Sequence, residues 1–183
     1  MIKRLLVLAI VIITGISFGQ SKVGTTAANF LTIPVGSKAV GMGGAFVAIA
    51  NDATALYWNP GSVSRFERNE FNVSYSEWLV GTKFNWIGLT FNISDNDAIG
   101  ISVNQLDYGD EEITTPNQPN GTGERWKAQD IAFTFTYAKN LTDRFSIGGS
   151  LKYIRQQIWN ESASAFALDI GLLFQTQLEG LKI

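Results

Sequence analysis

Few residues in this chain could carry out chemistry of their own. The sequence has no His and no Cys, which removes the commonest general base, the commonest metal ligand and any thiolate nucleophile. Gly41-Met42-Gly43-Gly44 has the glycine content of a phosphate-binding loop, but no Lys-Ser or Lys-Thr pair follows it and no strand pattern leads into it. The sequence therefore predicts a protein that is not an enzyme and binds no cofactor.

Other polar residues could hold a cation, but simpler structural explanations are available. Asn51, Asp52 and Asn59 are typical of turns and helix caps. A solvated loop surface explains the acidic cluster, with bound divalent cations as the alternative; its members are Asp107, Asp110, Glu111 and Glu112. We predict no metal site. The net charge of −2 gives no electrostatic reason to expect nucleic acid as a partner.

Residues 1–19 have the pattern of a secretory signal peptide. Lys3 and Arg4 precede a short apolar run, and small residues close the segment in front of Gln20. The sequence therefore predicts export, with cleavage before Gln20. No later run of 18 apolar residues follows, so no transmembrane helix is expected.

From Asn69 onward the hydrophobic pattern has a period of two, which indicates β-strands. The clearest segment spans residues 131–138, and similar segments span 71–80, 84–94, 99–104, 145–153 and 166–172. Their small-residue faces carry few charges, unlike the solvated face of a soluble sandwich. The pattern predicts an all-β, antiparallel up-and-down outer-membrane β-barrel.

Residues 65–183 should supply about six to seven strands, with residues 180–183 opening the last one. Because the smallest known single-chain membrane barrels have about eight strands, we expect this barrel to be incomplete and the chain to be an N-terminal fragment.

The alternation also assigns the two faces of each strand. Large side chains should face lipid and small or polar ones the lumen; on one strand these are Ile131, Phe133, Phe135 and Tyr137 against Thr134 and Thr136. Lys152 and Asp169 fall on the small-residue faces of neighbouring strands. They are therefore predicted to form an ion pair in the lumen.

Four tryptophans fall at the same end of an up-and-down meander: Trp78, Trp86, Trp126 and Trp159. Tryptophan is enriched at membrane–water interfaces, so we predict that these four form an aromatic girdle. Tight turns at residues 94–97 and 140–144 should lie at the opposite end, as periplasmic turns do.

Residues 20–64 are rich in Gly and Ala and lack clean strand alternation. We predict a compact hatch, or plug, with one or two short helices. Its segment 37–61 is too apolar for a free tail, and we expect it to pack on the small-residue face of the sheet.

Segment 39–61 resembles the N-terminal signature of the PorV/PorQ family and, more distantly, the hatch of FadL-type transporters. The resemblance rests on Gly41, Gly43, Gly44, Asn51, Asp52, Asn59 and Pro60, with Ala45 and Ala53 beside them. It implies a hatch inside the lumen of a FadL-like barrel and contact with outer-membrane lipid in a Gram-negative-type bacterium. It also implies a role in protein secretion of the type IX kind, with secretion-system proteins or exported substrates as partners.

Two other functions stay open on the sequence. One is a FadL-like channel for hydrophobic small molecules such as long-chain fatty acids, which would need an apolar pocket beside the hatch and an opening in the wall. The other is a secreted soluble β-sandwich adhesin, against which the uncharged small-residue faces argue.

Overall fold

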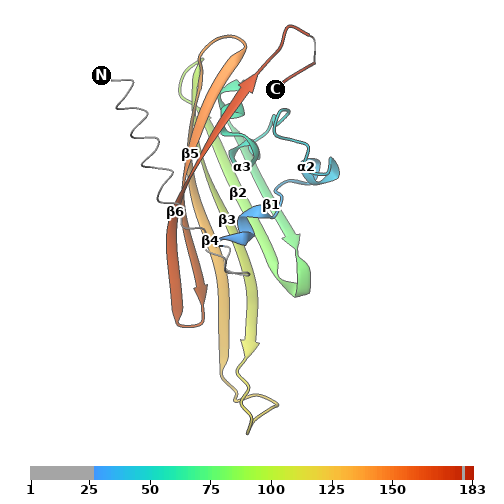
Figure 1. Ribbon diagram of the computed structural model, residues 1–183, viewed down its shortest axis with the longest axis vertical. Helices are drawn as coiled ribbons and strands as arrows, with labels where there is room; N and C mark the ends of the chain where they lie inside the picture. The colour runs from blue at the N-terminus through green and yellow to red at the C-terminus, as the bar shows by residue number, and fades with distance from the viewer. Residues whose placement is uncertain (1–26, 179) are drawn as a thin grey trace, which may run out of the picture.

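Short helices come first along the chain and six strands follow (Figure 1). The computed structural model describes residues 27–178 and 180–183, so the expected signal peptide lies outside the described residues. The helices are η1 (Asn29–Thr32), α2 (Ser37–Gly41), α3 (Ala55–Trp58), η2 (Pro60–Arg65) and η3 (Leu79–Gly81). The strands are β1 (Glu70–Glu77), β2 (Lys83–Asn92), β3 (Asp97–Glu112), β4 (Arg125–Asn140), β5 (Phe145–Ile158) and β6 (Glu161–Phe174).

The strands form one antiparallel sheet in sequence order, β1-β2-β3-β4-β5-β6. This confirms the predicted all-β, up-and-down architecture. Within the described residues the sheet is open, and β1 and β6 form its edges. After β6 the chain turns back, and the backbones of Phe174 and Ile183 exchange hydrogen bonds of 2.7 and 2.9 Å. The residues predicted to open a further strand therefore lie beside this edge, joined to it by an isolated bridge and not as a strand.

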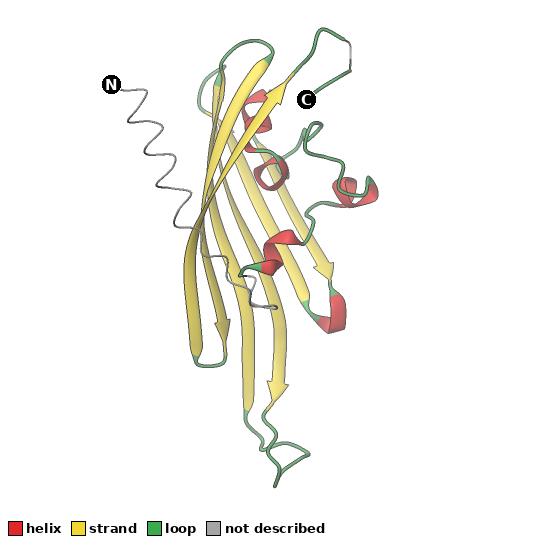
Figure 2. Cartoon of the chain, viewed as in Figure 1, coloured by secondary structure: helices red, strands yellow, loops and turns green. Residues whose placement is uncertain are grey.

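Alternation along the strands separates two faces of different character. Phe133 and Phe135 are about half exposed on one face (49% and 51%), whereas Thr134 and Thr136 are 4% and 0% exposed on the other. The predicted separation of these side chains onto two faces of β4 is therefore confirmed, while contact with lipid and lumen stays a prediction. The helices before β1 lie on the threonine side of the sheet (Figure 2). We call this the inner face and the opposite one the outer face.

The outer face carries an apolar band that ends at polar side chains on both sides. On β4 the band runs from Ile131 to Tyr137, between Gln129 and Lys139. On β5 it stops at Arg155. Such a band is what a bilayer requires of a barrel wall. None of the helices among the described residues is long and apolar enough to span a membrane.

The β3–β4 hairpin extends beyond its neighbours at one end of the sheet (Figure 1). Its register shifts between Asp107 and Asp110, where Gly109 has a φ of 80°. A bulge of this kind lets the strand bend, and glycine adopts the left-handed conformation without a steric penalty. The acidic cluster therefore lies on the strand before the loop rather than within it, and Asp110 pairs with Lys127 at 3.1 Å.

The connections differ between the two ends of the sheet. The two turns predicted to be tight, which follow β2 and β4, lie together at the end opposite the long hairpin. The connection between β5 and β6 is also tight, because only Trp159 and Asn160 separate these strands at the long-hairpin end. Tight turns are therefore not confined to one end.

Leu151 lies in the middle of the apolar band and tests its contact with lipid. We expect Leu151→Arg to destabilise the membrane-inserted protein by about 2–4 kcal/mol, because an arginine near the bilayer midplane is costly to desolvate. Gln157→Arg, on the same face of β5 but outside the band on the side of the long hairpin, should cost ~1 kcal/mol or less. The measurement is reversible urea unfolding in lipid vesicles. Equal costs at the two positions would refute contact with lipid.

Candidate functional site

The second half of the hatch touches the sheet backbone to backbone. A Cβ atom on Gly148 of β5 would lie 2.3 Å from the carbonyl oxygen of Pro60. A Cβ atom on Gly61 would lie 2.7 Å from the carbonyl oxygen of Gly171 in β6. Distances under 3 Å leave no room for a side chain, so only glycine at these positions lets η2 lie directly on the inner face.

Asn59 joins three parts of the molecule at this contact. Its Oδ1 accepts a hydrogen bond from the Gly61 amide at 3.0 Å, which caps η2. Its Nδ2 donates to the carbonyl oxygens of Val47 and Leu172 at 3.1 and 3.0 Å. The side chain is only 2% exposed, and these bonds connect the hatch loop, the η2 helix and β6.

The end of η2 is fastened to β4 and to the turn that follows it. Ser64 and Asn140 share two hydrogen bonds of 2.8 Å, one to the side chain and one to the backbone of Ser64. The guanidinium of Arg65 donates to the carbonyl oxygens of Thr142 and Asp143 at 2.9 and 2.7 Å. Burial lowers the pKa of Arg65, but an arginine stays charged at neutral pH. Arg65 thus supplies hydrogen-bond donors to two backbone carbonyls of the β4–β5 turn and links the end of η2 to that turn.

Two aromatic residues of α3 hold the earlier part of the hatch. The Tyr57 hydroxyl donates to the Leu31 carbonyl, and the Trp58 indole N–H donates to the Val35 carbonyl, both at 2.9 Å. Burial raises the pKa of Tyr57 to about 12, so the hydroxyl remains a donor at neutral pH. At the start of α3, the Asp52 carboxylate accepts from the Thr54 amide at 2.9 Å. Asp52 is therefore part of a turn, as its residue type predicted.

The glycine-rich stretch 40–49 makes no such backbone-to-backbone contact with the sheet, although Phe46 within it is buried. Gly41 has open space around its Cα, and Gly43 and Gly44 have positive φ angles of 64° and 83° that serve a turn. Apolar side chains of this stretch stay exposed by 38–51%; they are Val40, Met42, Val47 and Ile49. The expectation that all of segment 37–61 packs on the sheet is therefore wrong for its first part. Asn51 is also peripheral, and it accepts from Lys38 at 2.6 Å.

Lys152 and Asp169 form a salt bridge on the inner face, between β5 and β6. The pair lies in a cavity of 430 Å³ between the hatch and β6, where Tyr57, Trp58 and Pro60 form the opposite wall. The cavity combines an ion pair with aromatic surfaces, so it is not purely apolar. Among the described residues, no three acidic side chains converge on a point where a metal could bind.

Two of the four tryptophans do not face outward as a girdle requires. Trp86 is 1% exposed on the inner face, where its ring lies over Gly88. Trp126 shares the inward parity of Ala128 and is half-buried. The girdle prediction is therefore wrong for these two, because the end of a strand does not fix the face of its side chain. Trp78 and Trp159 lie exposed in connections at the long-hairpin end.

Tyrosine and phenylalanine occupy the outward positions that the tryptophans lack. Near the long-hairpin end these are Tyr75, Tyr153 and Phe166; near the other end they are Phe71, Phe91, Tyr137 and Phe174. Strand parity applied to all aromatic residues, rather than to tryptophan alone, would have found them.

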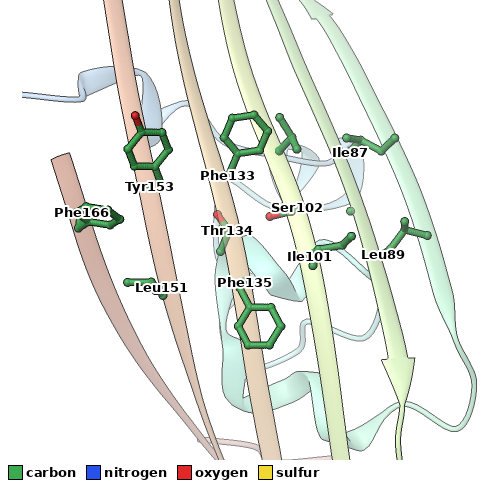
Figure 3. Close-up of a pocket in the computed structure, with 12 residues that line it drawn as sticks. Ile87, Leu89, Ile101, Ser102, Phe133, Thr134, Phe135, Leu151, Tyr153 and Phe166 are labelled. Atoms are coloured by element: carbon green, nitrogen blue, oxygen red, sulfur yellow. The ribbon is translucent and has the colours of Figure 1, made fainter. Parts of the chain in front are cut away.

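The outer face has a shallow groove in the middle of its apolar band (Figure 3). Its volume is 440 Å³, and its walls include Phe133, Phe135, Leu151 and Ile101. Ser102 and Thr134, which are each only 4% exposed, contribute to its floor. The groove therefore offers an almost entirely apolar surface to whatever covers this face.

Comparison with protein families decides the class of this molecule. A family model described as "Type IX secretion system protein PorV" matches residues 17–180, which covers the hatch and all six strands. The chain belongs to the PorV family. No match was found among curated proteins, and none among solved structures. As a PorV-family protein it is an outer-membrane component of type IX secretion.

Adjacent glycines on opposite faces of β5 give this PorV-family chain a matched pair of variants. Gly148→Ala places a methyl group against the Pro60 backbone, and we expect a loss of about 1–3 kcal/mol in hatch docking. Gly149→Ala faces outward, where the nearest atom is 3.6 Å away, and should leave the hatch in place. Limited proteolysis of residues 53–65 in outer membranes reports the difference. Equal protection in both variants would show that close packing does not hold the hatch.

Removal of the Asn59 side chain tests the hydrogen-bond junction separately. Asn59→Ala removes a buried side chain, leaves the carbonyls of Val47 and Leu172 without this donor and should cost about 1–3 kcal/mol. Asn51→Ala removes only an exposed contact and should change stability by ~0.5 kcal/mol at most. Hydrogen exchange of the Gly61 amide measures the loss directly. Unchanged exchange in Asn59→Ala would contradict the role of this junction.

Proposed function

We propose that this chain serves type IX secretion as a non-enzymatic docking component in the outer membrane. Its outer face lies in lipid, and its hatch closes the inner face. The observation that carries the proposal is the direct backbone contact of η2 with β5 and β6, in a chain of a secretion family. A clamped inner face favours binding of secretion-system proteins or exported substrates at exposed surfaces over passage through the protein.

The absence of His and Cys from the sequence supports a binding role over catalysis. No acidic side chains among the described residues cluster in threes to hold a metal that could replace them. Export by a signal peptide over residues 1–19 is part of the same proposal, because a protein of the outer membrane must first leave the cytoplasm.

A FadL-like channel for hydrophobic small molecules is the second candidate. The cavity beside the hatch is the feature that favours it. The Lys152–Asp169 salt bridge in that cavity argues against an apolar ligand, since the two charges of this half-buried pair would have to lie against hydrocarbon. We therefore rank the channel below the docking component.

A soluble sandwich adhesin is disfavoured by the sheet itself. A sandwich buries one face of each sheet against a second sheet. The strands of the described residues form a single sheet, and its apolar outer face is uncovered. Lipid covers such a face more readily than water does.

A reducible disulfide that holds the hatch on the sheet distinguishes a docking component from a transport channel. The natural chain has no cysteine, so cysteines introduced at Ser64 and Asn140, whose side chains are 2.8 Å apart, can be bridged selectively. We expect the bridged protein to support secretion at the level of the unbridged one, because docking does not require the hatch to leave. The readout is the amount of exported cargo on the cell surface, before and after reduction of the bridge.

The same cells provide the control. A channel would lose uptake of a labelled long-chain fatty acid when the hatch is bridged and regain it on reduction. That result, or a loss of secretion in the bridged state alone, would contradict a static hatch in a docking component.

A further inference from the structure

Arg155 is an exposed cation at the border of the outer apolar band that lies nearer the long β3–β4 hairpin. On β5 it lies opposite Ile131 of β4 and Ser164 of β6, and Tyr153 is its next neighbour on the same face toward the groove. No carboxylate forms a salt bridge with Arg155 within the described part of the chain. Its charge is therefore available to a ligand outside the protein.

The surroundings of Arg155 differ from those of two other outer cations. Lys127 and Lys139 are each paired with an aspartate of β3, at 3.1 and 3.0 Å. The outer faces of β4, β5 and β6 carry no acidic residue at all. The polar neighbours of Arg155 on this face are neutral: Gln129, Gln157, Ser162, Ser164 and Tyr153. Amide and hydroxyl groups around an unpaired guanidinium favour an anion.

The apolar groove begins at Tyr153, the next residue after Arg155 on the same face of β5. Tyr153 is fixed by two contacts with β6. Its ring lies 5.3 Å from the ring of Phe166, and its hydroxyl is 3.1 Å from the Ser164 hydroxyl. Tyr153, Phe166 and Phe133 form one end of the groove, and Phe135 and Leu151 continue it (Figure 3). The outer face thus places a cation that can bind an anion, Arg155, next to an apolar groove that can bind a hydrocarbon chain.

We propose that this surface binds one phosphorylated lipid of the lipid A type, with a phosphate on Arg155 and an acyl chain in the groove. The inference rests on the proposed placement of the outer face in lipid and names a specific lipid contact for it. Arginine recognises phosphate through two parallel N–H···O bonds, which gives the contact direction as well as charge. The choice of leaflet follows from the long hairpin, which lies at the same end as Arg155 and is typical of the outside.

The test uses the full chain in phosphatidylcholine nanodiscs, with bisphosphorylated lipid A as the probe and native mass spectrometry as the readout. Arg155→Gln should weaken lipid A binding by at least about tenfold. Lys83→Gln, an outward cation of β2 that lies directly opposite the acidic Asp107 of β3, should change it by less than about twofold. Leu151→Trp, which fills the groove, should also weaken binding.

Three results would overturn the proposal. Equal binding by Arg155→Gln and Lys83→Gln would remove the role of the cation. Equal binding of dephosphorylated lipid A would remove the role of the phosphate. Full competition by inorganic phosphate would indicate a phosphate site in which the groove has no part. Flotation of each variant with vesicles is measured in parallel, so that failure of membrane insertion is recognised separately from failure of lipid A binding.

Discussion

The backbone of η2 lies against the backbones of β5 and β6, and the rest of the structure depends on this contact. Two chains can approach so closely only where neither carries a side chain, and Gly61, Gly148 and Gly171 meet this condition together. The hydrogen bonds of Asn59 and Arg65 depend on this contact. Their acceptors, the carbonyl oxygens of Leu172 and Asp143, are within reach only because η2 lies so close to the sheet. The inner faces of β5 and β6 therefore carry glycine where η2 lies on them.

The same alternation that makes one face small makes the other large and apolar. Successive side chains of a strand point to opposite faces, so a register that turns the small side chains inward also turns the large ones outward. Thr136 and Ser150 hydrogen-bond on the inner side at 2.7 Å, while Phe135 and Leu151 beside them form the outer band. Packing of the hatch and contact with lipid are thus two consequences of a single pattern, and membership of an outer-membrane secretion family agrees with both.

The parts of this structure that the sequence predicted are those that depend on local alternation. Period-two patterning found all six strands and assigned the faces of Phe133 and Thr134, because each needs only the residue types next to it. Lys152 and Asp169 were paired for the same reason, since both lie on small faces of consecutive strands. Trp86 was misplaced because its position near a strand end was considered without its parity, although Gly88, two residues later on the same face, marks the space for its ring. Asn59 bonds to Leu172 and Gly61 packs on Gly171, both more than 100 residues away, so no local pattern could reveal these contacts.

Accessibility of single sites to lipid-phase and water-phase quenchers shows directly whether the outer face of β4 lies in lipid and its inner face under the hatch. The natural chain has no cysteine, so a spin label at position 135 or 136 of the full protein in vesicles reports one face of β4 alone. We expect oxygen dissolved in the bilayer to relax the label at position 135 strongly, and the label at position 136 to be protected from both oxygen and a water-soluble quencher. Strong relaxation by the water-soluble quencher at position 135 would show that the outer face does not lie in lipid.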